Sequence, residues 1–331
     1  MRLKIVLMGF GFMGRIHAKN IKCHAGAELV AVYSAIETDK ADIEKLGARF
    51  YSDWRKMLEN ETADAVVVAT PTFMHEEITL AAFDRGMHVF LEKPMERTVA
   101  RCQAINKAAK SKGLQLGLGH VLRFDEQYMA IKEQVASGMI KAKMARCTRR
   151  GPRPNWASWF FDEEKSGTVI LDLSIHDVDF MCWLAGRAPA RVSAEASPIL
   201  AGERMIFGIS HVVLDFGSWD GLELGFAEAS WAASSTYPFS TSIEISGKNG
   251  LLACSIPGKH PIETYTASGR APLNVYARDG YYNEMDDFIT AITRGTSPKV
   301  TGDDGLLAVR TCLAALESAK HHQTIKLEGF S

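Results

Sequence analysis

Short apolar runs alternate with helical patterns along the first third of the chain. The apolar runs lie at Lys4–Met8, Leu29–Tyr33, Ala65–Ala69, His88–Leu91 and Leu114–Leu118. Helix patterns lie between them, at about residues 13–25, 39–46, 74–85 and 98–112. Nearly continuous apolar strands that alternate with helices are typical of a parallel sheet covered on both faces. The pattern therefore predicts a doubly wound parallel sheet, an α/β domain, over residues 1–120.

Glycine and threonine mark where several of these helices end and begin. Gly47, Gly86 and Gly113 each follow a helix pattern, and glycine takes the left-handed conformation of a helix C-terminus without strain. Thr98 precedes the last of these helices and carries the hydroxyl that suits an N-cap. These four residues place the boundaries of the predicted helices.

The pattern changes after residue 120. A helix at about 124–137 and a strand at about 143–149 lead into a polar loop, and a helix then runs from Gly167 to Leu184. Further strands are predicted at about 190–197, 207–216, 221–230, 240–246, 250–255 and 273–277. Two amphipathic helices follow, striped by Tyr281, Met285, Phe288, Ile289 and Ile292 and by Leu306, Val309, Leu313 and Leu316. Consecutive strands without intervening helices predict an α+β domain over residues 121–331, with an open, largely antiparallel sheet.

Composition narrows the class of protein. The 331 residues suit two domains, and 47% of them are hydrophobic, enough for two cores. Lys and Arg number 38 and Asp and Glu 39, so the net charge of −1 argues against a nucleic-acid or membrane-surface partner. No apolar run is long enough for a membrane span. The six cysteines form no close pairs, so we expect buried, reduced thiols and a cytoplasmic protein.

A glycine-rich turn follows the first predicted strand and opens the first helix. It reads Gly9-Phe10-Gly11-Phe12-Met13-Gly14, a Gly-x-Gly-x-x-Gly pattern in the context that dinucleotide binding requires. Gly9 allows the tight turn, Gly11 lets a pyrophosphate approach the backbone, and Gly14 lets the helix pack on the strand. The pattern predicts a Rossmann domain that binds the phosphates at the helix N-terminus.

The end of the second strand leaves the choice of dinucleotide open. In dinucleotide-binding domains this position usually carries an acid that binds the ribose 2′-hydroxyl and selects NAD. Here it is Ser34, with Ala35 beside it. The expected acid is absent from this position, and so is an arginine that would pair with a 2′-phosphate. The cofactor is therefore NAD(P), with neither NAD nor NADP favoured.

The fifth apolar run leads into Glu92-Lys93-Pro94. Ligands of open parallel sheets lie beyond the carboxyl ends of the strands, so Lys93 is expected to face the cofactor cleft. A lysine there can donate to a substrate oxygen and stabilise developing negative charge. Pro94 suits a turn with a cis bond. The alternative is a surface lysine that merely follows a strand.

Three polar residues interrupt an apolar helix. Asp172, His176 and Asp179 are spaced i, i+4 and i+7 on one face, among Val169, Ile170, Leu173, Val178 and Met181. A carboxylate and an imidazole one turn apart can form an acid/base pair, in which the carboxylate orients the ring and the imidazole carries the proton. A zinc site and a buried hydrogen-bonded pair are the alternatives. No cysteine or third histidine lies nearby in sequence, so we expect no metal.

Taken together, these segments resemble the Gfo/Idh/MocA family of oxidoreductases (glucose–fructose oxidoreductase, inositol dehydrogenase, rhizopine catabolism). The resemblance covers nearly the whole chain. Its markers are the glycine-rich turn, Ala69-Thr70-Pro71-Thr72 followed by His75, Glu92-Lys93-Pro94, Leu171–Asp177 and Tyr282–Phe288. It implies a Rossmann domain, a C-terminal domain with an open sheet, and NAD(P)-dependent oxidation of sugars, polyols or their derivatives.

The resemblance also implies roles for particular residues. Lys93, Asp172 and His176 match the catalytic group of the family. The positions that match the cofactor site are Gly9, Phe10, Gly11, Phe12, Met13, Ser34, Thr70, Pro71, His75, Glu92, Lys93 and Trp159. Arg123 matches a position near the substrate, and Tyr237 and Tyr282 are further candidates. Two positions depart from the family pattern: Ser34 replaces the usual acid, and Thr72 stands where asparagine is common.

These observations favour a cytoplasmic NAD(P)-dependent dehydrogenase of a small-molecule sugar or polyol. Two alternatives remain. A family member that cleaves glycosides through a transient ketone would keep the same residues, whereas a non-catalytic sensor of nucleotide and sugar could lose Lys93 or His176 without penalty, and both are present. Arginines and tryptophans before the Asp172 helix would suit an acidic or phosphorylated sugar, or stacking on a pyranose ring, if they face the cleft; they are Arg149, Arg150, Arg153, Trp156 and Trp159. Because an exposed apolar sheet face is a liability, we expect a homodimer or homotetramer packed through the open sheet.

Overall fold

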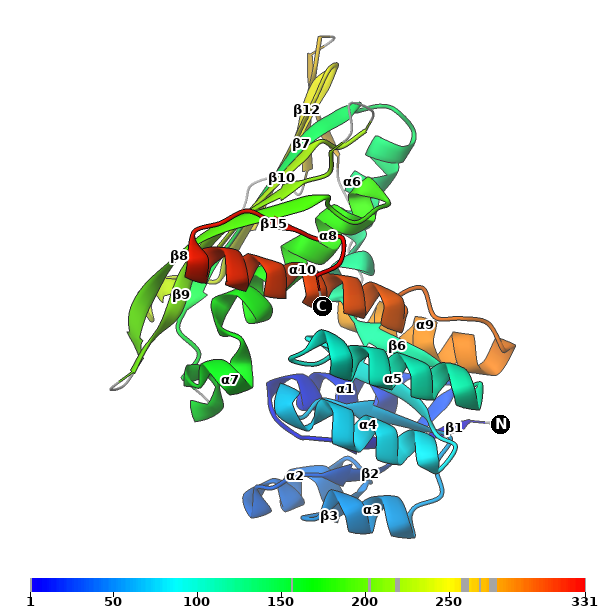
Figure 1. Cartoon of the computed structure of the whole chain (residues 1–331). Coiled ribbons are helices and arrows are strands. Elements are labelled where there is room, and N and C mark those ends of the chain that lie inside the picture. The colour runs from blue at the N-terminus through cyan, green and yellow to red at the C-terminus, as the bar shows by residue number, and fades with distance from the viewer. Residues whose placement is uncertain are drawn as a thin grey trace. The chain divides into compact units, whose positions relative to one another are not determined.

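The chain forms two compact units. The computed structural model describes residues 2–155, 157–201, 204–217, 221–256, 262–267, 269–273 and 279–330. The first unit comprises Met1–Phe124 and Arg278–Leu306, and the second comprises Asp125–Ala277 and Leu307–Ser331 (Figure 1). Trp156 and the predicted strand at 273–277, apart from Leu273, lie outside the described residues.

The first unit is built on a six-stranded sheet whose paired strands are all parallel, as predicted. Its order is β3-β2-β1-β4-β5-β6. The strands span Leu3–Met8 (β1), Ala27–Tyr33 (β2), Arg49–Tyr51 (β3), Ala65–Val68 (β4), His88–Glu92 (β5) and Leu116–Gly119 (β6). Every residue of β4 is fully buried, because helices cover both faces of a parallel sheet.

Helices connect these strands. They span Phe12–Cys23 (α1), Lys40–Lys45 (α2), Trp54–Asn60 (α3), His75–Asp84 (α4) and Val99–Lys112 (α5). The predicted helix ends are confirmed: Gly47, Gly86 and Gly113 have positive φ angles, and the Thr98 side chain accepts from the Arg101 amide. Strand β3 and helix α3 were not predicted, because three and seven residues are too few for a clear period.

One helix from the end of the chain belongs to the first unit. Helix α9, Gly280–Arg294, buries Met285, Phe288 and Ile289 in the same hydrophobic cluster as Ile5 and Phe90 of β1 and β5. Residues 278–306 therefore lie in the first unit, whereas the sequence analysis assigned all of 121–331 to the second domain. Helix α10, Gly302–His321, begins in the first unit and continues in the second.

The second unit is built on a nine-stranded sheet in the order β14-β13-β12-β11-β7-β10-β9-β8-β15. The strands span Ala142–Pro152 (β7), Arg191–Ala201 (β8), Arg204–Asp215 (β9), Leu224–Ala233 (β10), Ser240–Gly247 (β11), Gly250–Ile256 (β12), Ile262–Thr266 (β13), Gly269–Leu273 (β14) and Ile325–Lys326 (β15). Among the described strand pairs of this second sheet, only β7–β10 is parallel. The prediction of a largely antiparallel sheet is confirmed. Strands β13 and β15 were not predicted, and β14 shares only Leu273 with the strand predicted at 273–277.

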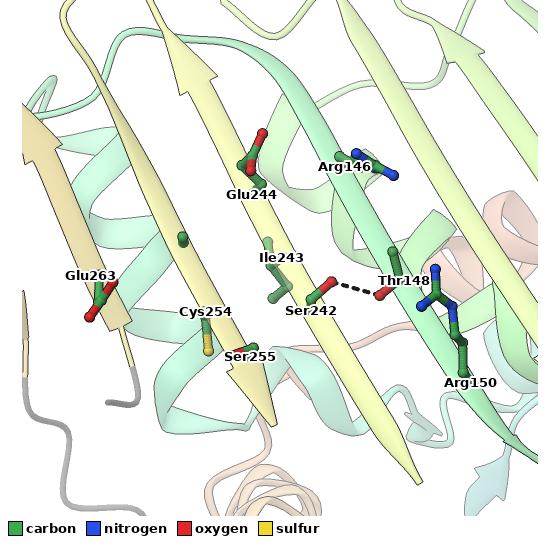
Figure 2. Close-up of a pocket in the computed structure, with 10 residues that line it drawn as sticks. Arg146, Thr148, Arg150, Ser242, Ile243, Glu244, Cys254, Ser255 and Glu263 are labelled. Carbon is green, nitrogen blue, oxygen red and sulfur yellow. Dashed lines mark hydrogen bonds between the residues drawn. The ribbon is translucent and has the colours of Figure 1, made fainter. Parts of the chain in front are cut away.

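The two faces of this sheet differ. Along β7, Ala145, Cys147 and Arg149 are buried, while Arg146 and Arg150 alternate with them and are exposed. Figure 2 shows Arg146, Thr148 and Arg150 beside Ser242 and Glu244 of β11, where they line a pocket with residues of β12 and β13. The helices of this unit include Glu126–Ala136 (α6), Glu163–Ser166 (α7) and Ile175–Ala185 (α8).

Candidate active site

The glycine-rich turn has the shape of a dinucleotide cradle. Gly9 has φ +96°, and a Cβ on it would lie 2.6 Å from the carbonyl oxygen of Ala69. A Cβ on Gly14 would lie 2.1 Å from the carbonyl oxygen of Gly9, so both glycines are required by the chain's own packing. Gly11 has φ −72°, which any residue adopts, and a Cβ on it would meet nothing within 4 Å. The space beside Gly11 fits a pyrophosphate at the N-terminus of α1.

The residues inside this turn differ in exposure. Phe10 is buried, Met13 is half-buried and Phe12 is exposed. The Arg15 guanidinium lies over the Phe10 ring, 4.3 Å from its centroid. Phe10 therefore supports Arg15 on the first turn of α1.

Ser34, at the end of β2, lies in a polar network that the sequence analysis missed. It is buried and its hydroxyl donates to Asp39 Oδ2 at 2.6 Å. Arg15 donates to Asp39 Oδ1, also at 2.6 Å, and to Asp42 at 3.2 Å. An acid and an arginine are thus both present beside the strand end. The acid is five residues later than expected, and a short 3-10 helix, Glu37–Asp39, brings it back to Ser34.

His75 ties together the ends of β4 and β5. It is 1% exposed, with Nδ1 2.9 Å from the carbonyl oxygen of Pro94 and Nε2 2.9 Å from that of Thr70. Burial lowers the pKa of this imidazole, and a neutral ring donates through one of its two nitrogens. Thr70 is buried and Pro71 half-buried in the segment that His75 holds. His75 therefore holds the Thr70–Pro71 segment and Pro94 in place from inside the protein.

Lys93 follows β5 and is held through its own backbone. Glu92 is 5% exposed; its Oε1 lies 2.6 Å from Nε2 of His17, and its Oε2 accepts the Lys93 amide at 3.1 Å. Burial acts to raise the pKa of Glu92, but the hydrogen bond from His17 and the nearby cations hold it below its usual range. The Lys93–Pro94 bond is cis and Lys93 is half-buried.

Arg123 is engaged in an ion pair of the first unit. Its Nη1 donates to Asp304 Oδ1 at 2.9 Å, and its side chain is 9% exposed. Burial would raise the pKa of Asp304, but Arg123 and Thr301 hold it below its usual range. A substrate that contacts Arg123 would have to share its guanidinium group with Asp304.

The three aromatic candidates lie in different settings. Tyr282, at the start of α9, is half-buried, and its ring centroid lies 5.9 Å from that of His24. Tyr237 is 43% exposed, with its hydroxyl 3.2 Å from that of Ser240. Trp159 is half-buried and stacks on Phe160 at 4.1 Å.

Asp172 lies in one turn of π-helix, whereas an α-helix from Gly167 was predicted. The π turn spans Ile170–Ser174 and leads into α8. It follows Gly167 and Thr168, which both have positive φ angles, and Thr168 is buried and β-branched, so its backbone is strained. Such π turns occur frequently at functional sites. Asp172 and His176 are both half-buried, while Asp179 is 1% exposed.

Arg149, one of the arginines that precede the Asp172 helix, is a buried strand residue. It lies in β7, is 5% exposed, and donates to the two oxygens of Asp177 at 2.9 and 3.2 Å. It also donates to the Tyr128 hydroxyl at 3.3 Å, and burial raises the pKa of that phenol. Asp177 directly follows His176, so this pair anchors the start of α8. The signal that could have revealed it is an arginine in register with the buried residues of its strand.

Lys93 belongs to the first unit, and Asp172 and His176 belong to the second. Within the first unit the fold brings together the glycine-rich turn, Ser34, the Thr70–His75 segment and Lys93 at the carboxyl ends of the strands. A nicotinamide dinucleotide fits this edge.

Comparison with known proteins identifies the family. The N-terminal model of an oxidoreductase family with an NAD-binding Rossmann fold matches residues 3–120, and the Gfo/Idh/MocA C-terminal domain matches residues 128–253. A myo-inositol 2-dehydrogenase of Thermotoga maritima is 30% identical over 98% of this chain and 99% of its own length. An inositol 2-dehydrogenase of Rhizobium meliloti is 29% identical over 99% of this chain and all of its own length.

Solved structures agree with this comparison. A crystal structure described as a probable dehydrogenase from Thermotoga maritima has a TM-score of 0.85 and 30% identity, and covers 99% of this chain and all of its own. GenD2 from gentamicin A biosynthesis, crystallised with NAD, has a TM-score of 0.86 and 25% identity over 98% of this chain and 96% of its own.

The chain belongs to the Gfo/Idh/MocA family. It is an NAD(P)-dependent oxidoreductase, a dehydrogenase acting on the CH–OH group of a sugar, polyol or derivative. None of the helices in the described part of the chain is long and apolar enough to cross a bilayer.

Proposed function

We propose that this dehydrogenase oxidises a ring hydroxyl of an inositol-like cyclic polyol, with Lys93, Asp172 and His176 as its catalytic residues. The observation that carries the proposal is Lys93, a half-buried cation fixed at the carboxyl end of β5 beside the dinucleotide cradle. The names of relatives that span nearly the whole chain support the substrate class.

The roles follow from charge and acid/base chemistry. Oxidation of a CH–OH group releases one hydride from carbon and one proton from oxygen. Lys93 donates a hydrogen bond to the substrate oxygen and stabilises its developing negative charge. His176 accepts the proton, and Asp172 orients its ring. The bound dinucleotide supplies the hydride acceptor.

The cofactor site uses the cradle and the two strand-end segments. We assign to it Gly9, Phe10, Gly11, Phe12, Met13, Ser34, Thr70, Pro71, His75, Glu92, Lys93 and Trp159. His75 and Glu92 act by positioning, because their polar atoms are bound inside the protein. Gly11→Val should weaken NADH binding while the fold survives, because the new side chain would occupy the open space beside residue 11. Unchanged affinity in a folded variant would refute the assignment.

A substrate panel tests the proposed reaction. Inositol isomers, other polyols, sugars and sugar acids would each be offered with NAD and with NADP, and the reduced nicotinamide would be measured. We expect one equivalent of reduced cofactor per turnover, with the fastest turnover on a cyclic polyol. Glycoside cleavage without net formation of reduced cofactor would instead show that the protein cleaves glycosides through a transient ketone. Arg123, Tyr237 and Tyr282 are the candidate substrate contacts.

We further propose a homodimer or homotetramer packed through the open face of the nine-stranded sheet. That face carries half-buried apolar side chains such as Met144 and Phe226, beside Arg150 paired with Glu228. An uncovered face of this kind favours association. Light scattering at micromolar concentration should give at least twice the 36.4 kDa chain mass.

A cytoplasmic location is the accompanying proposal. Cys102, Cys147, Cys182, Cys254 and Cys312 are free thiols packed inside the two units, and Cys23 is an exposed free thiol. Free thiols suit a reducing compartment. Expression of the chain with a fluorescent tag would test this.

A further inference from the structure

A second carboxyl group lies beside Glu92 and has no role in the proposed reaction. Glu284 is on helix α9 and is 1% exposed. Neither of its carboxyl oxygens has a hydrogen-bond partner among the described residues. A buried carboxyl that accepts no hydrogen bond is costly as an anion, so its protonation state needs an explanation.

Glu284, Glu92 and His17 form one buried cluster from three elements of the first unit. Each offers an atom within 4.8 Å of the others. The His17 ring packs edge-on against Phe90, 5.2 Å between centroids, and Phe90 packs against Phe288 at 5.6 Å. The cluster therefore lies against an apolar core, where charges interact strongly.

The hydrogen bonds determine which of the two carboxyl groups carries the charge. Glu92 accepts from His17 and from the Lys93 amide, whereas Glu284 accepts from no described donor. Two buried carboxyl groups at this separation do not both ionise. Glu92 keeps the charge, and Glu284 keeps the proton.

The surroundings of Glu284 also favour its protonated form. Burial first, and then the charges of Glu92 and Asp279, raise the pKa of Glu284 well above its usual range. On the other side of the cluster, His17 and Lys93 lower the pKa of Glu92. Gly119 leaves the room that the Glu92 carboxyl fills, since a Cβ there would lie 3.0 Å from its Oε2.

We propose that Glu284 is a carboxylic acid in the native protein, and that the pair Glu92–Glu284 holds a single proton and so keeps the charged Glu92 in place beneath the Lys93 amide. Glu284 is then a positioning residue that acts on Lys93 through Glu92. Only this effect on Lys93 rests on the proposed function; the protonation state does not.

The first test is the pH dependence of stability. A carboxyl whose native pKa is raised binds one more proton folded than unfolded, so wild-type stability falls as pH rises above its ordinary pKa. Glu284→Gln is neutral at every pH and should remove this loss. Between pH 5.5 and 7, the folding constant of the variant should gain about tenfold per pH unit over wild type. Glu77→Gln, an exposed carboxyl of the same unit, is the control. Parallel profiles for wild type and Glu284→Gln would overturn the proposal.

The second test detects the protonation state directly in the wild-type protein, with Glu284→Gln for comparison. Wild-type protein at pH 7 should show the infrared carbonyl band of a protonated carboxylic acid, and Glu284→Gln should lack it. Absence of the band in wild type would overturn the proposal. So would a divalent cation that wild type retains after dialysis against a chelator and that Glu284→Gln has lost, because a metal ion on His17, Glu92 and Glu284 would replace the proton.

The third test separates this inference from the proposed reaction. With the polyol that wild type oxidises best, Glu284→Gln should keep kcat within a few-fold, while Glu284→Ala should lower kcat more than it raises KM. If wild type oxidises no polyol but the infrared band is present, the proposed reaction fails and the protonation state stands. If Glu284→Ala has wild-type kcat, Glu284 is not a positioning residue for Lys93.

Discussion

Lys93 and His176 are each supported by a buried ion pair one residue away, and the two pairs differ in kind. Glu92 precedes Lys93 and is bound by His17, whereas Asp177 follows His176 and is bound by Arg149. The histidine can lose its proton, but the guanidinium cannot. The pair in the first unit can therefore change its charge, while the pair in the second is obligatorily ionic.

The difference teaches how each side chain is held. Lys93 follows Glu92, which lies in a buried cluster with two other titratable groups, His17 and Glu284, so this support can respond to protonation. His176 sits next to a π turn and a strained Thr168, and its support is a fixed two-bond clamp. A strained backbone persists only where the surrounding structure holds it, and an ion pair that stays charged provides such support.

The largest expected effects are on Lys93 and His176, the proposed catalytic side chains that these pairs support. His176→Ala should lower kcat by about 10²–10⁴-fold, the range of one general base, and should abolish the rise of kcat/KM with pH in the oxidation direction. Lys93→Ala should be at least as damaging, with the dinucleotide still bound. Steady-state kinetics across pH check both; a His176→Ala enzyme with wild-type rate and pH profile would make His176 a packing residue.

Breaking the fixed pair should cost the most stability. Arg149→Met leaves Asp177 charged and buried, which should cost about 3–5 kcal/mol of unfolding free energy. The double variant Arg149→Met with Asp177→Leu should recover most of this loss, because it leaves no uncompensated charge. Urea unfolding of the single and double variants measures the difference. A single variant within about 1 kcal/mol of wild type would contradict the obligatory pair.

Breaking the adjustable pair should cost less and should depend on pH. Glu92→Gln removes a carboxylate whose pKa is held low by the hydrogen bond from His17 and by nearby cations. Because the native pKa of Glu92 is low, its charge stabilises the fold at pH values above the ordinary glutamate pKa. This stabilisation is lost as the pH falls through the native pKa of Glu92. We expect a loss of about 1–3 kcal/mol at pH 7 that shrinks toward pH 4. A loss that is equal at both pH values would show that packing, not charge, holds this cluster.

The smallest expected effect concerns the cofactor. Arg15 and Asp39 compensate each other beside Ser34, so wild type should discriminate NAD from NADP by less than about 100-fold, or 2.7 kcal/mol. Asp39→Asn should shift the preference toward NADP by removing a negative charge, and Arg15→Ala should shift it toward NAD. The ratio of kcat/KM for the two cofactors measures both shifts. Shifts in the opposite directions would mean that other residues recognise the ribose.

Several features of the site were predictable because they depend on neighbouring residues. The Gly-x-Gly-x-x-Gly turn follows a strand and opens a helix, and Lys93 follows a strand whose carboxyl end faces the ligand edge. The largely antiparallel second sheet was predictable from consecutive strands alone.

Other features depend on side-chain contacts and backbone geometry that leave no distinct pattern in the sequence, and sequence reasoning missed them. Asp39 reaches Ser34 through a short 3-10 turn, and Arg149 reaches Asp177 across 28 residues. The π turn at Asp172 leaves the same apolar pattern as an α-helix, so periodicity did not distinguish them.

The sequence by itself determined the sheet types and the glycine-rich turn between β1 and α1, because short patterns of residues specify local conformation and strand burial. Only the tertiary structure decided that α9 joins the first unit and brings Glu284 to Glu92 across 192 positions. It also decided which carboxyl groups are paired and which is left without a donor. The physical reason is that charge and protonation in a buried site depend on distance and desolvation, which the folded chain alone defines.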